Sequence, residues 1–261
     1  MKIGLLTSQA FSVNALHQLA RGDDDLVVIT VPPAIAERAE VAGYLDFAPL
    51  CARLGIPCHA LGRYDFGAPE DLAMLERLGL DVLLTMGWNR LLPEPVLAAP
   101  RLGVIGSHTS PAALPFGRGR APVVWSLVLG MAQVSCQLLK LDAGADTGPV
   151  LARRAVPVGA DDTTQIMYYK IAAAQTAMIP EAIARLTEGG ALASSGLPQL
   201  DLPKRGPDDA NIRWTDPAPS IHNLVRAVAR PFHGAFFAAD GRPQTLWQTR
   251  LWDADLPPGA P

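Results

Sequence analysis

Short apolar segments alternate with helical periodicity along the first part of this chain. The apolar segments are rich in Val, Ile and Leu and end in small polar residues, as buried parallel strands do; they cover residues 3–7, 26–31, 81–86 and 104–107. Helices are expected between them, together with a short strand at 56–59; the helices cover residues 12–21, 45–54, 69–78 and 95–99. This alternation predicts an α/β fold with an open, mostly parallel sheet and flanking helices.

The second part of the chain extends this pattern. A helix at 122–130 precedes two strand-like segments, 133–141 and 149–156, and the long helix after Asp161–Thr164 contains Pro180, where we expect a kink or a break. Residues 191–207 are rich in Ser, Gly and Pro, and a helix (220–229) and two strands (234–238 and 244–251) follow. We therefore predict a main domain at 1–190, a linker at 191–207 and a small α+β subdomain at 208–261.

Charge and cysteine content restrict the partners of the chain. The 22 basic and 25 acidic side chains give a net charge of −3 without a basic cluster, so we expect no nucleic-acid partner. Three cysteines without a C-x-x-C motif indicate a reducing compartment, and the scattered histidines offer no metal site. No apolar stretch reaches the roughly 18 residues that cross a membrane. The expectation is a soluble cytoplasmic protein without a membrane partner.

Two polar residues near the ends of predicted strands form the candidate site. Ligands of open α/β sheets bind at the carboxyl ends of the strands, which here are Ser8–Phe11, Gly87–Leu92 and the segment from His108 onward. His108 follows one strand, and Asp146 lies in the loop after another; a carboxylate beside an imidazole orients it for proton transfer. A structural histidine and a turn aspartate are the alternative interpretation. No G-x-G-x-x-G or G-x-S-x-G motif supports a dinucleotide or a serine-hydrolase site.

The motifs around these residues resemble the folate-dependent formyltransferase superfamily, which includes methionyl-tRNA and sugar N-formyltransferases. The resemblance rests on His108, on the L-P-x-G-R-G-R-A-P stretch that ends at Pro122, and on the D-x-G motif at Asp146. Met86-Gly-Trp-Asn-Arg-Leu-Leu-Pro93 is similar to the folate-pocket loop of the family, and residues 205–235 resemble its small C-terminal part. The resemblance covers nearly the whole chain and implies a Rossmann-like fold.

The resemblance also implies the roles of individual residues. The co-substrate would be 10-formyltetrahydrofolate, and the acceptor an amine. His108 and Asp146 would be the acid–base pair, with Gly106 at the position of a family asparagine. Eight residues would contact the folate: Met86, Trp88, Arg90, Leu91, Leu92, Leu141, Ala143 and Asp146. Three further residues would contact the acceptor: Ser8, Arg118 and Arg120.

The chain departs from the family pattern at two places. Gly106 lies two residues before His108, on the same face of a strand, so the side-chain amide that would bind the oxyanion is missing there. Loss of one oxyanion donor costs on the order of 100- to 1000-fold in rate in other enzymes. The segment Thr109–Ala113 is about two residues longer than its family counterpart.

Three functions are compatible with the sequence. The first is an N-formyltransferase acting on a small amine, such as an amino sugar nucleotide or an amino-acid-like intermediate. The acidic balance and the unbasic segment 33–43 favour this acceptor over tRNA. The second is a 10-formyltetrahydrofolate hydrolase, and the third is a folate-binding protein without catalysis. A homodimer is compatible with each of them.

Overall fold

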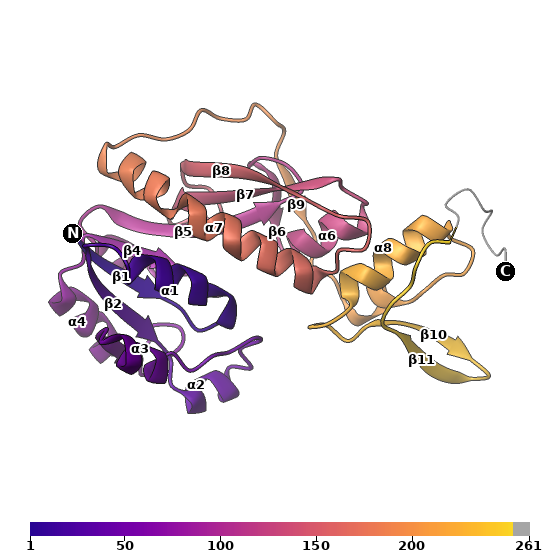
Figure 1. Ribbon diagram of the computed structural model, residues 1–261, viewed down its shortest axis with the longest axis horizontal. Coiled ribbons are helices and arrows are strands. Elements are labelled where there is room, and N and C mark those ends of the chain that lie inside the picture. The colour runs from indigo at the N-terminus through magenta and orange to yellow at the C-terminus, as the bar shows by residue number, and fades with distance from the viewer. Residues whose placement is uncertain (253–261) are drawn as a thin grey trace. The chain divides into compact units, whose positions relative to one another are not determined.

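Seven strands form the central sheet of the protein, in the order β3-β2-β1-β4-β5-β7-β8 (Figure 1). The computed structural model describes residues 1–252. The strands have the following bounds: β1 Lys2–Leu6, β2 Asp25–Thr30, β3 Cys58–Ala60, β4 Val82–Thr85, β5 Gly103–Ser110, β7 Gln133–Lys140 and β8 Val150–Pro157. Every apolar segment expected to be a strand forms one, and the predicted α/β class is confirmed.

The first five strands of the sheet are parallel, and β7 runs against them. β1 pairs in parallel with β2 and β4, and β4 with β5. The N–H of Leu141, just after β7, donates to the carbonyl of Val104 near the start of β5, at 2.8 Å. Lys140 N donates to the carbonyl of Pro149, just before β8, at 3.0 Å, which closes a hairpin. The sheet is therefore mostly parallel, as predicted.

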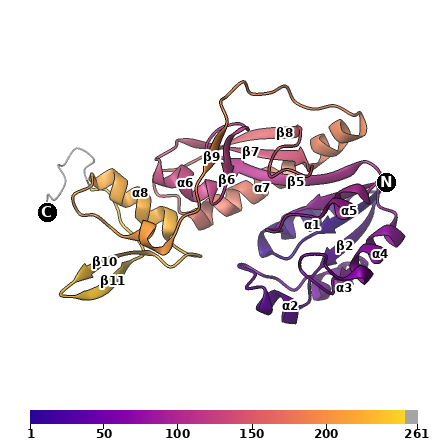
Figure 2. The ribbon, with the colours of Figure 1, turned by 180° about the vertical axis from the view of Figure 1, so that it is seen from behind.

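Eight α-helices connect and cover these strands in the described part of the chain. Their bounds are α1 Val13–Leu19, α2 Pro33–Arg38, α3 Ala48–Leu54, α4 Pro69–Leu78, α5 Glu94–Ala98, α6 Pro122–Val128, α7 Thr164–Thr187 and α8 Ala218–Val228. A 3-10 turn at Ala10–Ser12 precedes α1, and another covers Pro207–Ala210. Figure 2 shows the same elements from behind. No helix within residues 1–252 combines the length and the apolarity that a membrane crossing requires.

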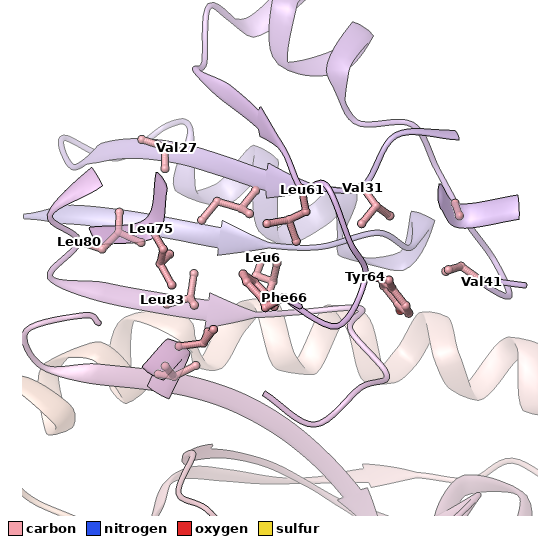
Figure 3. Close-up of a cluster of buried hydrophobic side chains, with 14 residues drawn as sticks. Leu6, Val27, Val31, Val41, Leu61, Tyr64, Phe66, Leu75, Leu80 and Leu83 are labelled. Carbon is pink, nitrogen blue, oxygen red and sulfur yellow. The ribbon is translucent and has the colours of Figure 1, made fainter. Parts of the chain in front are cut away.

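One face of the parallel strands carries a compact hydrophobic core (Figure 3). Leu6, Val27 and Leu83 come from three adjacent strands, and Leu75 comes from α4. All four are at most 2% exposed. Truncating such a leucine to alanine costs about 2–5 kcal/mol, so this packing fixes the strand ends that carry the candidate site.

The chain forms two compact units whose segments interleave. The first comprises Met1–His108, Gln137–Arg154 and Ala172–Ala193. The second comprises Thr109–Cys136, Ala155–Ile171 and the residues from Ser194 onward. Strands β5, β7 and β8 and helix α7 each contribute to both units. The predicted sequence domains 1–190 and 208–261, with their linker, stay a prediction.

Two further sheets have two strands each. β6 (Phe116–Gly119) pairs in parallel with β9 (Leu200–Leu202), inside the segment predicted to be a linker. β10 (Ala235–Ala239) and β11 (Arg242–Leu246) form an antiparallel hairpin around Asp240-Gly241, as the turn residues predict. The strand in the predicted linker was not foreseen, because its partner lies about 80 residues earlier and the pairing leaves no local pattern.

Three local predictions need correction. β5 continues to Ser110, so His108 lies inside the strand and not after its end. The segment after β2 contains helix α2, where no helix was expected from the sequence. Helix α7 is unbroken at Pro180, so of the two expected outcomes the break is wrong and the kink stays a prediction. Met178 and Ile179, before the proline, and Ala182, after it, are buried, and their packing holds the helix together.

Candidate active site

His108 and Asp146 lie side by side in the first compact unit. Nδ1 of His108 is 3.2 Å from Oδ2 of Asp146, and the two side chains are 8% and 24% exposed. His108 projects from β5, whereas Asp146 comes from the loop between β7 and β8. The carboxylate therefore faces one ring nitrogen and fixes the orientation of the imidazole, which is the arrangement that proton transfer requires.

The loop that carries Asp146 is held by its own hydrogen bonds. The carboxylate of Asp142 accepts hydrogen bonds from the N–H of Gly144, at 3.1 Å, and from the hydroxyl of Thr147. A Cβ atom on Gly148 would lie 1.8 Å from the carbonyl oxygen of Lys140, so only glycine allows the loop to close on the end of β7. Asp146 adopts a positive φ of 55° between these anchors. The conformation of the loop thus presents the carboxylate to His108.

Gly106 and Leu141 lie in direct contact beside His108. A Cβ atom on Gly106 would come within 2.6 Å of Cδ2 of Leu141. The leucine side chain therefore occupies the volume in which a side chain at position 106 would begin. Position 106 offers no side-chain amide, and the hydrocarbon end of Leu141 lies in that volume.

The loop predicted to bind folate follows β4 in the same unit. The hydroxyl of Ser8 donates to the carbonyl of Gly87, at 3.1 Å, and the backbone N–H of Ser8 donates to the same oxygen, at 3.3 Å. Met86 is buried, while Leu91 is 77% exposed. Ser8 is fully buried, and its hydroxyl supports this loop from inside the protein.

Two aromatic residues outside the predicted site, Tyr64 and Phe66, support this loop. Trp88 packs against Tyr64, with ring centroids 4.4 Å apart, and against Phe66, at 5.9 Å. The hydroxyl of Tyr64 donates to Oδ1 of Asn89, at 2.6 Å, and the guanidinium of Arg90 lies 5.7 Å from the Tyr64 ring centroid. The close spacing of the two aromatic residues, Tyr64 and Phe66, is the local signal that could have identified this support from the sequence.

A cavity of about 350 Å³ adjoins this loop. Its lining residues include Arg38, Arg63, Tyr64, Asp65 and Arg90. Arg63 forms a salt bridge with Asp65, at 2.9 Å, and this pairing together with a backbone hydrogen bond from Gly67 lowers the pKa of Asp65 to about 2. The lining contains three arginines and one aspartate, so its charge is mainly positive (the cationic rim) and suits an anionic group.

The remaining predicted residues lie at separate places. Ala143 is exposed in the loop of Asp146, and Leu92 packs against the hydrophobic core. Arg118 and Arg120 belong to the second compact unit. The guanidinium of Arg118, in β6, lies 3.4 Å from Oε1 of Gln199, and the backbone N–H of Arg120 donates to the carbonyl of Leu202, at 3.3 Å.

The loop after β4 contains one polar group without a partner. The indole N–H of Trp88 is buried and has no hydrogen-bond partner among the described residues. Arg90 and Leu91, in the same loop, are exposed. Residues 1–252 hold no cluster of three His, Cys, Asp or Glu side chains that would bind a metal ion.

Comparisons with known proteins identify the family of the chain. A model of the formyl transferase family matches residues 14–183, and a model of the formyl transferase C-terminal domain matches residues 205–260. The chain is 30% identical to a methionyl-tRNA formyltransferase of Paracoccus denitrificans over 99% of its own length and 85% of that protein.

Solved structures extend the likeness to the fold. A sugar N-formyltransferase from a Shewanella species shares 15% of its sequence, with a TM-score of 0.67 over 97% of this chain and 99% of the other. A sugar 3N-formyl transferase, solved in the presence of dTDP and 5-N-formyl-tetrahydrofolate, has a TM-score of 0.65 and 15% identity, over 87% of this chain and 78% of the other. At these identities the likeness shows a shared fold.

Proposed function

Because the chain belongs to the formyl transferase family, we propose that it moves a formyl group from 10-formyltetrahydrofolate to the amine of a small molecule. The observation that carries this proposal is the His108–Asp146 pair, with the two side chains 3.2 Å apart. The pair lies in the unit that also holds the loop predicted to bind folate, Met86–Pro93, called the Trp88 loop below. An amino sugar nucleotide or an amino-acid-like compound is the proposed acceptor class. The family match establishes a formyl-transferring enzyme, which argues against the third function, a folate-binding protein without catalysis.

The reaction sets three tasks for the protein. The co-substrate supplies the formyl carbon on its nitrogen N10; transfer joins this carbon to the amine nitrogen, breaks the bond to N10 and moves one proton from the amine to N10. The chain must therefore hold the two nitrogens close together, stabilise negative charge on the formyl oxygen and move a proton.

His108 performs the proton transfer in this proposal. Its Nδ1 is turned toward Asp146, so the imidazole exchanges protons with the reacting nitrogens through Nε2. Asp146 stabilises the imidazolium that forms when the amine loses its proton. Since no side-chain amide is available at Gly106, the charged imidazole is also the group that faces the developing oxyanion.

Asp146 and the Trp88 loop position the co-substrate. The indole N–H of Trp88 and the exposed backbone at Arg90 and Leu91 provide hydrogen-bonding groups for the pterin ring. The cationic rim at Arg38, Arg63 and Arg90 provides attraction for an anionic part of either substrate. The tight contacts between Trp88, Tyr64 and Phe66 keep this loop in place before any ligand binds.

A pair of substitutions tests the roles of His108 and Asp146. We expect His108→Gln and Asp146→Asn to lower kcat at least about 100-fold, because general acid–base catalysis contributes this much or more. Steady-state turnover of 10-formyltetrahydrofolate, followed by the release of tetrahydrofolate, measures the change. His59→Gln, in the edge strand β3, is the matched control and keeps full activity. Turnover within twofold of the native rate in Asp146→Asn contradicts the proposed mechanism.

An acceptor screen tests the proposed reaction itself. The panel contains dTDP- and UDP-linked amino sugars, free amino acids and methionyl-tRNA, and mass spectrometry detects a gain of one formyl group. We expect a formylated small amine. Release of formate without any formylated product would instead support the 10-formyltetrahydrofolate hydrolase, which the missing amide at Gly106 favours as the second candidate.

A further inference from the structure

Leu141 fits against Gly106 so closely that the two residues form a matched pair. A Cβ atom on Gly106 would lie 2.6 Å from Cδ2 of Leu141, 2.9 Å from Cγ and 3.0 Å from Cδ1. Atoms that are not bonded to each other do not approach this closely without strain. The branched end of the leucine therefore fills the space over the glycine, and no side chain fits at position 106 unless Leu141 moves.

This pair covers the face of β5 from which His108 projects. Residues 104, 106 and 108 point to the same side of a strand. Val104 faces the hydrophobic core on this side, and Leu141 packs against the same core. The N–H of Leu141 donates to the carbonyl of Val104, at 2.8 Å, which fixes the leucine at this position along the strand. A hydrocarbon wall thus extends from the core to the residue beside His108.

The position of this wall matters because water competes with the amine for the formyl group. When water reacts, its oxygen bonds to the formyl carbon and the bond to N10 breaks. One proton passes to N10 and a second is released as formic acid ionises, so the products are formate and tetrahydrofolate. An enzyme that transfers the group must keep water away from the imidazole. The partly buried Leu141 limits access on this side, since a water molecule needs both space and polar partners.

We propose that Leu141 is a specificity-determining residue that excludes water from the flank of His108 and so favours transfer to an amine over hydrolysis. The inference rests on the proposed function and deepens it. In this proposal Leu141 selects between the amine and water, the two nucleophiles that the His108–Asp146 pair could activate equally.

Formate release in the absence of any amine tests the inference directly. Leu141→Ala opens the space over Gly106, on the face of β5 from which His108 projects. We expect the rate of formate release from 10-formyltetrahydrofolate to rise roughly tenfold, the effect of a few buried methylene groups on selectivity. Leu141→Met keeps the volume of the side chain, so it should release formate more slowly than Leu141→Ala does. Loss of folding would not increase formate release, so a gain separates this role from a structural one.

A double-mutant cycle tests the contact itself without any substrate. Gly106→Ala adds a Cβ atom that meets Leu141 and should lower Tm by about 3–6 °C, as overpacking of a core does. In the Leu141→Ala background the same substitution should change Tm by less than about 2 °C, because the colliding atoms are gone. Equal shifts of Tm in both backgrounds would show that the two side chains do not compete for one space.

The outcomes for the inference and for the proposed function are distinct. A folded Leu141→Ala protein with native formate release overturns the inference alone. If Leu141→Ala does not fold, Leu141→Val, which removes one carbon, takes its place, and an unchanged formate rate in that variant has the same meaning. If the native protein neither releases formate nor formylates any compound of the acceptor panel, the proposed function fails, and the inference fails with it.

Discussion

At the scale of single residues, two thiols show how the tertiary structure changes chemistry that the sequence cannot reveal. Cys51, in α3, is fully buried, and Cys58, in β3, is half-buried. A hydrogen bond from the Cys51 thiol lowers the pKa of Cys58, and this effect outweighs the opposing effect of burial. The same hydrogen bond, together with burial, raises the pKa of the Cys51 thiol. Both directions favour a thiolate on Cys58 over one on Cys51.

Alkylation kinetics check this assignment. A free cysteine has a pKa of about 8.5, so we expect the rate of reaction of Cys58 with iodoacetamide to reach half of its maximum below that pH. Cys51→Ala removes the donor and should move the midpoint upward. Peptide mass spectrometry identifies the alkylated residue at each pH. An unchanged midpoint in Cys51→Ala would mean that the neighbouring thiol does not stabilise the Cys58 thiolate.

At the scale of elements, the pairing of β6 with β9 depends on a close backbone approach at Gly119. This residue has a φ of 104°, and a Cβ atom on it would lie 2.4 Å from the carbonyl oxygen of Leu202. We expect Gly119→Ala to destabilise the protein by about 2–4 kcal/mol, because backbone strain and a collision with backbone add together. Urea unfolding followed by circular dichroism measures the loss.

Gly196 provides the matched control for this prediction. It also has a positive φ, of 71°, but no described atom lies within 4 Å of its Cβ position. Gly196→Ala should therefore lower the free energy of unfolding only because alanine disfavours a positive φ, by about 1 kcal/mol. Equal losses in the two variants would show that the close approach of β9 does not contribute.

Helix α8 is held in the second unit by a buried arginine. Arg226 is 7% exposed, and its Nη1 donates to the carbonyls of Gly159, at 3.0 Å, and Asp162, at 3.1 Å. Burial lowers the pKa of this guanidinium. Arg226→Met keeps much of the volume but leaves two carbonyls without their donor, so we expect a loss of about 2–4 kcal/mol in thermal or urea unfolding.

Arg213 is the control for the loss of a positive charge that is not buried. Its side chain is 75% exposed and pairs with Asp216, at 3.1 Å. Arg213→Met should cost no more than about 1 kcal/mol, because exposed ion pairs contribute little. A similarly small loss in Arg226→Met would mean that the buried hydrogen bonds do not hold α8.

At the scale of the whole molecule, the balance of charge bears on the acceptor. The net charge of −3 gives little long-range attraction for a polyanion, although a methionyl-tRNA formyltransferase is among the similar proteins. We expect the preferred small amine to be formylated with a kcat/KM at least about 100-fold above that of methionyl-tRNA at 0.15 M salt, where non-specific binding of nucleic acid is weak. Parallel assays with both acceptors measure the ratio. Efficient formylation of the tRNA that declines steeply with salt would reverse this conclusion.

The sequence alone determined the elements whose signals are local. Helix α4 begins and ends where its N-terminal proline and its C-terminal Gly79 predict, and the buried strands β1, β2 and β4 follow from short apolar segments. The same local motifs identified the family and drew attention to His108, Asp146 and Gly106. Such signals arise from backbone conformation and burial, which neighbouring residues control.

Only the tertiary structure decided the features that depend on residues far apart in the chain. Strands β6 and β9 pair across about 80 residues, so neither carries a pattern of its own. The end of β5 at Ser110 was misjudged because its last residues are polar, yet they lie in a buried strand. The 3.2 Å approach of Asp146 to His108 and the contact of Leu141 with Gly106 arise from the return of β7 beside β5. These contacts between distant residues follow from packing, which the fold as a whole decides.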